Sequence, residues 1–307
     1  MDDVVPIPDL LQTRPDRRVA GHRPIGQTKG EGSLANFDFA SQSAPDCPQF
    51  QGVRVFPDFL SPPEATTLLR EIDRSDFVKA QSGKRKQHYG PKINFNKKKM
   101  NSQNFEGLPA YAAELEDRLR NLARSERIEN RADRVRFESS LESFEATDVF
   151  VLRYLERDES NLDFHLDDTF AYGELILDLS LESDSVLTFL RTRLEAGSKA
   201  TECVRVPLPA RSLAAVYGPA RFEWEHAILS YDIADRRTSV TLRTLHENLL
   251  RTEDGQRVVE LARRSRKSQE RTFAAEQSDL HAGSESSSRI AFSTVDARIA
   301  VSSSEIT

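Results

Sequence analysis

ELILDLSL, residues 174–181, decides the fold of this chain because leucine occupies every second position. Alternate residues of a β-strand point to opposite faces, so this stretch predicts a strand with one buried face. Further short strands are expected on both sides of it, separated by turn residues such as Gly-Pro. They span residues 147–154, 186–191, 203–208, 212–217, 225–230 and 237–243. Seven or more short strands predict a jelly roll or another two-sheet barrel.

Two helices are expected before these strands. Ser61 to Glu64 combine an N-cap serine, prolines at the first helical positions and a glutamate that can close a capping box. The apolar residues that follow are spaced i, i+3, i+4 and i+7, which gives the helix one buried face. A second helix with the same spacing is expected over residues 109–125. We therefore predict a mainly β (α+β) fold with N-terminal helices packed on the strands, and alternation with period two from residue 135 onward.

The composition predicts flexible flanks around one folded unit. Charged residues make up 30% and hydrophobic residues 38% of the 307 positions, which is more polar than a typical compact domain. Residues 1–45 and the serine-rich residues 276–307 contain too little apolar surface to offset the entropy of ordering, so we expect disorder there. Residues 251–275 are densely charged and predict a solvated helix. The folded domain is then expected over residues 46–250.

Several classes of protein are excluded by cysteine count and charge. Cys47 and Cys203 are too few for a disulfide framework or a four-cysteine zinc site, which favours a reducing compartment. Neither a secretory signal nor a run of about 18 apolar residues is present. We expect a monomer in the cytoplasm or nucleus, without a membrane partner. The net charge of −6 excludes a uniformly basic nucleic-acid coat protein but allows a local basic patch.

DFHLDD, residues 163–168, contains the most informative polar residues. Residues that are two positions apart on a strand project to the same side, so His165 and Asp167 can reach one metal ion. A lone His-x-Asp is a weak signal, but His226 lies in a later predicted strand that a jelly roll can place beside them. Two imidazoles and one carboxylate leave three coordination positions open, which is the arrangement of non-heme Fe(II) oxygenases.

Two arginines in the last predicted strand form a second group. Arg237 and Arg243 share one strand face, opposite Val240 and Leu242, and their Cα atoms are expected about 20 Å apart. A guanidinium group can grip a carboxylate with paired hydrogen bonds, so this face can bind a small dianion. The alternative for the isolated motif is a pair of surface arginines on an edge strand.

The ordered set of His165-x-Asp167, His226 and the Arg-x-Ser-x-Thr-x-Arg motif of residues 237–243 resembles the AlkB family of Fe(II)- and 2-oxoglutarate-dependent dioxygenases. Three further stretches resemble the AlkB homologue four subfamily in particular. They are QSGKRKQHYGPKINF at 81–95, HLDD at 165–168 and VPLPARSL at 206–213. The resemblance spans about residues 50 to 250.

The resemblance implies a double-stranded β-helix core and an enzyme that uses Fe(II), 2-oxoglutarate and O2. The implied iron ligands are His165, Asp167 and His226. The implied reaction is oxidative N-demethylation, with release of formaldehyde, succinate and carbon dioxide.

The resemblance also implies how the cosubstrate binds. Arg237 would pair with the distal carboxylate of 2-oxoglutarate, assisted by the hydroxyl of Tyr154, and Arg243 would lie nearer the metal. Many family members have asparagine where this chain has Leu152 and Ser239. Because of these departures, the resemblance does not specify the finer hydrogen bonds to the cosubstrate. It still implies that the cosubstrate binds.

A basic stretch precedes the barrel. Residues 83–99 contain seven lysines and arginines and no acidic residue, with aromatic residues interleaved. Such a composition can hold nucleic acid through phosphates and base stacking, while the alternative is a solvated turn or a nuclear address. His88 within it is expected to be a surface histidine. The candidate substrate residues in this stretch are Lys84, Arg85, Lys86 and Tyr89.

An acidic stretch favours a different substrate. Residues 156–184 carry ten acidic residues against one arginine, and Asp163, Asp168 and Glu174 flank the predicted iron site. A carboxylate-rich entrance suits a cationic methyl-lysine, and Asp168 is a candidate substrate residue. The alternative is that these carboxylates only form the solvated face of a strand.

Members of the similar subfamily are associated with methyl-lysine of actin and with N6-methyladenine. We expect demethylation of an actin-like methylated protein lysine. The alternatives are a methylated nucleic-acid substrate, hydroxylation of a stable carbon, or a non-catalytic binding module for nucleic acid or protein.

Overall fold

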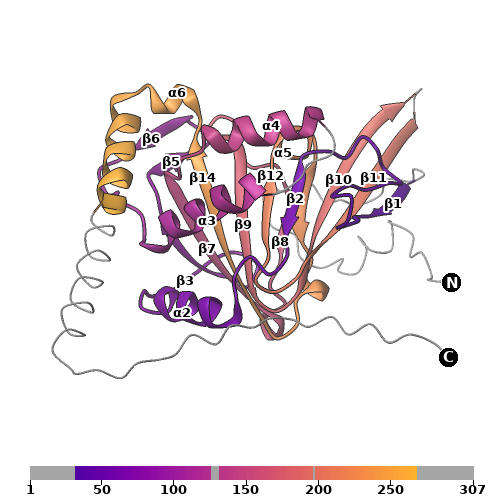
Figure 1. Cartoon of the computed structure of the whole chain (residues 1–307), viewed down its shortest axis with the longest axis horizontal. Helices are drawn as coiled ribbons and strands as arrows, with labels where there is room; N and C mark the ends of the chain where they lie inside the picture. Colours follow the sequence, from indigo (N-terminus) through magenta and orange to yellow (C-terminus); the bar gives the residue numbers. More distant parts are fainter. Residues whose placement is uncertain (1–31, 126–130, 196–197, 268–307) are drawn as a thin grey trace, which may run out of the picture. The chain divides into compact units, whose positions relative to one another are not determined.

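Two β-sheets, antiparallel except for the parallel pair β1–β11, form the body of the computed structural model, which describes residues 32–125, 131–195 and 198–267 (Figure 1). The five-stranded sheet has the order β1 (Gly32–Asn36), β11 (Ser198–Leu208), β10 (Ser185–Glu195), β13 (Glu225–Ile228) and β8 (Leu162–His165). The seven-stranded sheet has the order β2 (Val53–Phe56), β12 (Leu213–Val216), β9 (Tyr172–Glu182), β14 (Arg236–Leu245), β7 (Asp148–Leu155), β4 (Arg85–Tyr89) and β3 (Val78–Lys79). A separate hairpin consists of β5 (Lys92–Asn94) and β6 (Lys99–Asn101).

Strand β9 follows the leucine pattern. Its leucines at positions 175, 177, 179 and 181 are buried in the core cluster that contains the helices. Ile176, with the opposite parity, belongs to the cluster between the two sheets. The side chains of β14 alternate in step, since Leu179 pairs with Val240 and Leu177 with Leu242. The seven-stranded sheet therefore has one face toward the helices and one face toward the other sheet, and the second face carries the polar residues of the candidate site.

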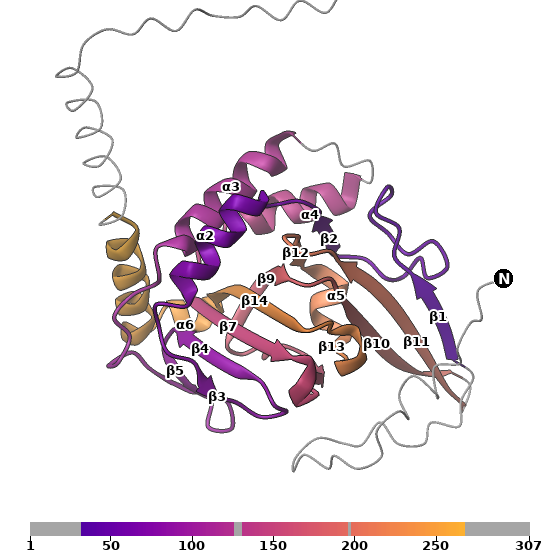
Figure 2. The same cartoon turned by 90° about the horizontal axis from the view of Figure 1, so that it is seen from below.

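Three helices cover the outer face of the seven-stranded sheet (Figure 2). They are α2 (Pro62–Ile72), α3 (Tyr111–Ser125) and α4 (Arg131–Glu142). At the start of α2 the backbone N–H and the hydroxyl of Ser61 both donate to the Glu64 carboxylate at 2.7 Å. The predicted mainly β fold with N-terminal packing helices is confirmed. The shorter helices are η1 (Glu156–Asp158), α5 (Gly218–Phe222), η2 (Ser230–Asp232) and α6 (Glu247–Leu250).

Helix α4 is the element that the sequence pattern missed. Its twelve residues contain few apolar side chains, and one of them, Val135, is 55% exposed. Phe137 is fully buried and packs against Phe56 and Tyr217. The expected period of two from residue 135 is therefore wrong until β7 begins at Asp148, because one buried aromatic anchors this helix without a regular apolar stripe.

The parts of the two expected flanks that the structure describes are folded and packed on the domain. Residues 1–31 and 268–307 lie outside the described residues, and with them the expected serine-rich tail and most of the expected N-terminal arm. Residues 32–45 are ordered, because β1 pairs in parallel with β11 and buries Ala35 and Phe37. The expected solvated helix is present over residues 253–267 but is anchored, since Val258 and Ala262 pack in a core cluster with Leu245.

The basic stretch at residues 83–99 is also structured. Strand β4 extends the seven-stranded sheet by pairing with β7, and the β5–β6 hairpin follows it directly. Within the described ranges, no helix is both long and apolar enough to cross a membrane.

Candidate active site

Three side chains from separate segments converge at one end of the sandwich. His165 is the last residue of β8, Asp167 follows in the next loop, and His226 lies on β13 directly opposite His165 in the strand register. One ligand atom from each lies within 4.8 Å of the other two. The two imidazole centroids are 4.4 Å apart, and His226 Nε2 lies 3.6 Å from Asp167 Oδ2. This donor set fits a single divalent metal ion with open coordination positions.

Both histidines are prepared to act as neutral ligands. His165 Nδ1 lies 2.8 Å from the carbonyl oxygen of Asp163, which can only accept, so this nitrogen donates and Nε2 keeps its lone pair for a cation. Burial, reinforced by the neighbouring His165, lowers the pKa of His226 to about 3. The His226 ring is therefore uncharged at neutral pH and can bind a metal.

The carboxylate of Asp167 is divided between two partners. Its Oδ1 accepts a hydrogen bond from Arg243 Nε at 3.0 Å and forms an ion pair with Arg243 Nη2 at 2.9 Å, while Oδ2 faces His226. Burial raises the pKa of Asp167, but the charge of Arg243 outweighs it and holds the pKa well below its usual range. Asp167 is therefore ionised, and its Oδ2 can serve as a metal ligand.

Arg221 on α5 shapes the loop that carries Asp167. Its buried guanidinium donates to the carbonyl oxygen of Asp167 at 2.8 Å and to those of Asp168 and Tyr172 at 3.3 and 3.4 Å. No motif in the sequence marks Arg221 as part of the site. Its one available signal was an arginine between apolar residues shortly before His226, and buried arginines of this kind usually satisfy several acceptors.

A second polar group lies farther along the inner face of the seven-stranded sheet. Arg237 is 0% exposed, and its guanidinium carbon lies 5.2 Å from the ring centroid of Tyr154, its partner in the β14–β7 register. Its Nη2 donates to Asp178 Oδ2 at 2.9 Å and its Nε to Ser180 Oγ at 3.0 Å. Burial raises the pKa of Tyr154, so its hydroxyl stays protonated and can donate. Asp178 therefore faces the interior, although its alternation with leucine was equally compatible with a solvated face.

The two arginines occupy opposite ends of one row. Arg243 contacts Asp167. Arg237, six residues earlier on the same face of β14, pairs with Asp178 of strand β9. Ser239 lies between them and hydrogen-bonds Tyr154. A buried guanidinium with a protonated tyrosine hydroxyl, on the same strand face as the arginine beside Asp167, suits the carboxylate of a small dianion, so the residues present fit 2-oxoglutarate.

The predicted substrate residues on β4 divide between its two faces. Lys86 Nζ lies 6.0 Å from the centroid of the inner-face ring of Phe150. Tyr89 packs on the opposite side in the cluster that contains the helices. Arg85 alternates with Lys86 and so shares the side of Tyr89. The structure therefore brings Lys86 toward the site but does not bring Arg85 and Tyr89 there.

Lys84 is buried just before β4 begins. Its ammonium group donates to the carbonyl oxygen of Asn161 and lies 6.0 Å from the ring centroid of Tyr154. Burial lowers its pKa to about 8, and the nearby charge of Asp163 offsets part of this effect. Lys84 therefore lies beside the Tyr154 end of the row rather than on an exposed substrate surface.

The buried Lys84 predicts a pH dependence of stability. Its pKa is about 8 in the folded chain against 10.5 ordinarily, so between these values the unfolded chain binds more protons. The free energy of unfolding therefore rises with pH in this window, by up to about 3 kcal/mol from this group. We expect the stability of the wild type relative to Lys84→Met to increase from pH 8 to 10.5 in urea unfolding. A pH-independent difference would contradict the burial of a charged amine.

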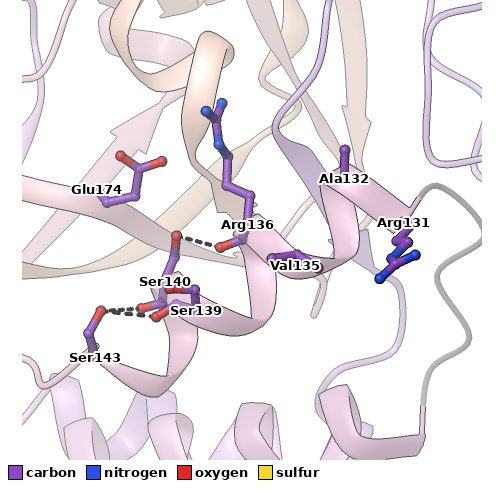
Figure 3. A pocket seen from close by; sticks show the side chains of 8 residues that line it. All are labelled: Arg131, Ala132, Val135, Arg136, Ser139, Ser140, Ser143 and Glu174. Carbon is purple, nitrogen blue, oxygen red and sulfur yellow. Dashed lines mark hydrogen bonds between the residues drawn. The ribbon is translucent and has the colours of Figure 1, made fainter.

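The acidic residues near the metal position are engaged within the protein. Asp168 Oδ1 accepts from the backbone N–H groups of Phe170 at 2.8 Å and Ala171 at 2.9 Å. Glu174 accepts from the backbone N–H of Gly218 at 2.9 Å and lines a pocket along α4, together with Arg136 (Figure 3). Asp168 therefore shapes the loop, and the expected carboxylate-rich entrance is not assembled by these two residues.

Comparison with known proteins agrees with this geometry. Residues 52–258 match the 2OG-Fe(II) oxygenase superfamily. Human alpha-ketoglutarate-dependent dioxygenase alkB homolog 4 is 34% identical over 220 residues, which cover 64% of this chain and 68% of the human protein. The mouse protein of the same name is 30% identical over 225 residues, covering 66% and 70%. The predicted resemblance to the AlkB family is confirmed by these relatives.

A Caenorhabditis elegans protein named DNA N6-methyl adenine demethylase is 31% identical over 195 residues, which cover 64% of this chain and 60% of the nematode protein. A crystal structure of a 2OG-Fe(II) oxygenase family oxidoreductase from Burkholderia pseudomallei is 13% identical, with a TM-score of 0.36, and the match covers 62% of this chain and 83% of that one. By its sequence match over residues 52–258, the chain belongs to the 2OG-Fe(II) oxygenase superfamily, as a dioxygenase of the AlkB type that uses Fe(II), 2-oxoglutarate and O2.

Proposed function

We propose that this dioxygenase removes N-methyl groups by oxidation, with His165, Asp167 and His226 as the iron ligands. The observation that carries the proposal is the convergence of these three side chains at the end of a row that leads to the buried Arg237. When bound, Fe(II) and 2-oxoglutarate supply the oxidation of a methyl C–H bond by O2. The resulting N-hydroxymethyl group then breaks down to formaldehyde and the free amine.

The side chains of the protein position the reactants. Arg237 binds the distal carboxylate of 2-oxoglutarate, and the protonated hydroxyl of Tyr154 donates beside it. Arg243 holds one oxygen of Asp167 and keeps the other free for the metal. Its guanidinium carbon also lies 4.9 Å from the ring centroid of Tyr172, which shields this end of the row from water.

For the substrate we propose a methylated base in nucleic acid, N6-methyladenine above all. Lys98, on the β5–β6 hairpin, has its Nζ 5.8 Å from the ring centroid of Phe170, which belongs to the loop that follows Asp167. The basic hairpin thus borders the metal loop, and Lys86 lies on the inner face of the neighbouring strand β4. Such a surface attracts a phosphate backbone.

This proposal departs from the expected methyl-lysine substrate. That expectation depended on free carboxylates at the entrance, whereas Asp168 and Glu174 bind backbone N–H groups and Asp163 lies beside Lys84. The name of the nematode relative, DNA N6-methyl adenine demethylase, points in the same direction as the basic hairpin.

A side-by-side formaldehyde assay tests the proposed function. The purified chain, with Fe(II), ascorbate and 2-oxoglutarate, is given a single-stranded N6-methyladenine oligonucleotide or a monomethyl-lysine peptide. We expect formaldehyde from the oligonucleotide, at a rate that falls as salt rises, and a KM raised about threefold or more by Lys98→Ala. Formaldehyde from the peptide alone would assign the enzyme to protein lysine. Salt-dependent oligonucleotide binding without formaldehyde from either substrate would support a binding module or a hydroxylase instead.

A further inference from the structure

We propose that His88 is a positioning residue for the metal site, acting through Asp148 and Arg243 on the carboxylate of Asp167. His88 lies on β4, in the basic stretch, and its side chain is 33% exposed. The inference uses the family assignment and the metal ligands, and it is independent of the substrate class.

A continuous chain of contacts joins His88 to the metal position. His88 Nε2 lies 2.6 Å from Asp148 Oδ2. The other oxygen of Asp148, Oδ1, lies 3.4 Å from Arg243 Nη1. The remaining donors of that guanidinium, Nε and Nη2, bind Asp167 Oδ1. Each carboxylate in the chain therefore has one oxygen for each neighbour, and Asp167 Oδ2 is left for the metal.

Asp148 is the point at which an exposed residue acts on the buried site. Its side chain is 0% exposed, so an ionised carboxylate there needs partners on both oxygens. Arg243 supplies one partner and His88 the other. Because a carboxylate accepts, the Nε2 atom of His88 donates, which orients both the histidine ring and the plane of the Asp148 carboxylate.

The backbone is shaped around this pair. A Cβ atom at Gly90 would lie 2.2 Å from Asp148 Oδ2 and 2.8 Å from His88 Nε2. Both distances are shorter than nonbonded atoms tolerate, so a side chain at this position would push Asp148 or His88 out of the present arrangement. The same space would not be required if His88 were an unattached surface side chain.

The physical consequence concerns how Arg243 is shared. With His88 in place, Asp148 is fixed and takes only one guanidinium nitrogen, which leaves two for Asp167. Without His88, Asp148 can rotate toward Arg243 and compete for those donors, so Asp167 is less well oriented. Partners outside the ligand shell typically change metal affinity by about 10- to 100-fold, and His88 acts one contact farther out.

The test measures Co(II) binding to the full-length chain without 2-oxoglutarate, followed by visible absorption. We expect His88→Ala to weaken Co(II) binding about three- to tenfold and to shift the cobalt absorption bands, because the geometry of Asp167 changes. His88→Gln can still donate to Asp148 and is expected to restore the affinity to within about twofold of the wild type. Gly90→Ala, which leaves the histidine in place but disturbs the pair, should behave like His88→Ala.

Arg85→Ala is the matched control, since it lies on the same strand but on the face directed away from the metal, and it should bind Co(II) like the wild type. Thermal melts of each variant separate loss of fold from loss of affinity. An unchanged Co(II) affinity in His88→Ala would overturn the proposal, and so would a His88→Gln variant that is as impaired as His88→Ala. A lowered melting temperature with unchanged cobalt spectra would likewise assign the pair a purely structural role.

Discussion

The Arg237→Ala enzyme is expected to need far more 2-oxoglutarate than the wild type. Arg237 is 0% exposed and lies between Tyr154 and Asp178, where no water can replace its charge. Truncating one partner of a buried charge pair costs about 2 to 5 kcal/mol, and about 1.4 kcal/mol is a factor of ten. The KM for 2-oxoglutarate, measured by succinate formation without a methylated substrate, should therefore rise at least about thirtyfold.

Two controls accompany this experiment. Arg236→Ala removes the neighbouring arginine, which points away and pairs with Glu182 at 2.5 Å, and should leave the KM unchanged. The double variant Arg237→Ala with Asp178→Ala removes the carboxylate left without its partner, so it should recover thermal stability but not cosubstrate affinity. A wild-type KM in a folded Arg237→Ala protein would place the 2-oxoglutarate site elsewhere.

Asp167→Ala is expected to lose turnover of 2-oxoglutarate altogether. Removing a residue that hydrogen-bonds a metal ligand typically lowers metal affinity or activity by about 10- to 100-fold. Loss of a ligand itself should therefore reduce succinate formation well over a hundredfold. The replacement also releases Arg243, which contacts Asp167 through a hydrogen bond of 3.0 Å and an ion pair of 2.9 Å. Succinate formation and metal content are measured on the same preparation, so that inactivity can be traced to lost metal.

Leu166→Ala serves as the matched control for this variant. Leu166 lies between His165 and Asp167 in the chain, is 40% exposed and has no metal-binding group. The control protein should retain its metal and its turnover. Substantial succinate formation by Asp167→Ala would show that this carboxylate is not a ligand.

The strand pattern and part of the candidate ligand group were predictable from local rules. Alternating leucines locate β9, since a half-buried strand must place every second side chain in the core. His165 and Asp167 are two residues apart, so even the sequence places them on one side. The position of His226 opposite them depends on the pairing of β13 with β8, which the similarity to a known family supplied and the spacing did not.

The residues that the sequence did not reveal act through tertiary contacts. Arg221 binds backbone carbonyls of the metal loop from another element, and no spacing in the sequence records such contacts. Asp178 has the alternation of a solvated strand face, but the second sheet covers that face and Arg237 neutralises its charge. Helix α4 lacks a regular apolar stripe because only two of its apolar side chains, Phe137 and Leu141, are buried.

Three side chains far apart in the sequence are proposed to bind one metal ion at the end of an arginine row. This can be tested by anomalous diffraction from crystals of the full-length chain grown with Mn(II). We expect one strong peak per chain within bonding distance of His165 Nε2, His226 Nε2 and Asp167 Oδ2. A well-occupied manganese ion bound elsewhere, or bound to only one of these three side chains, would contradict it.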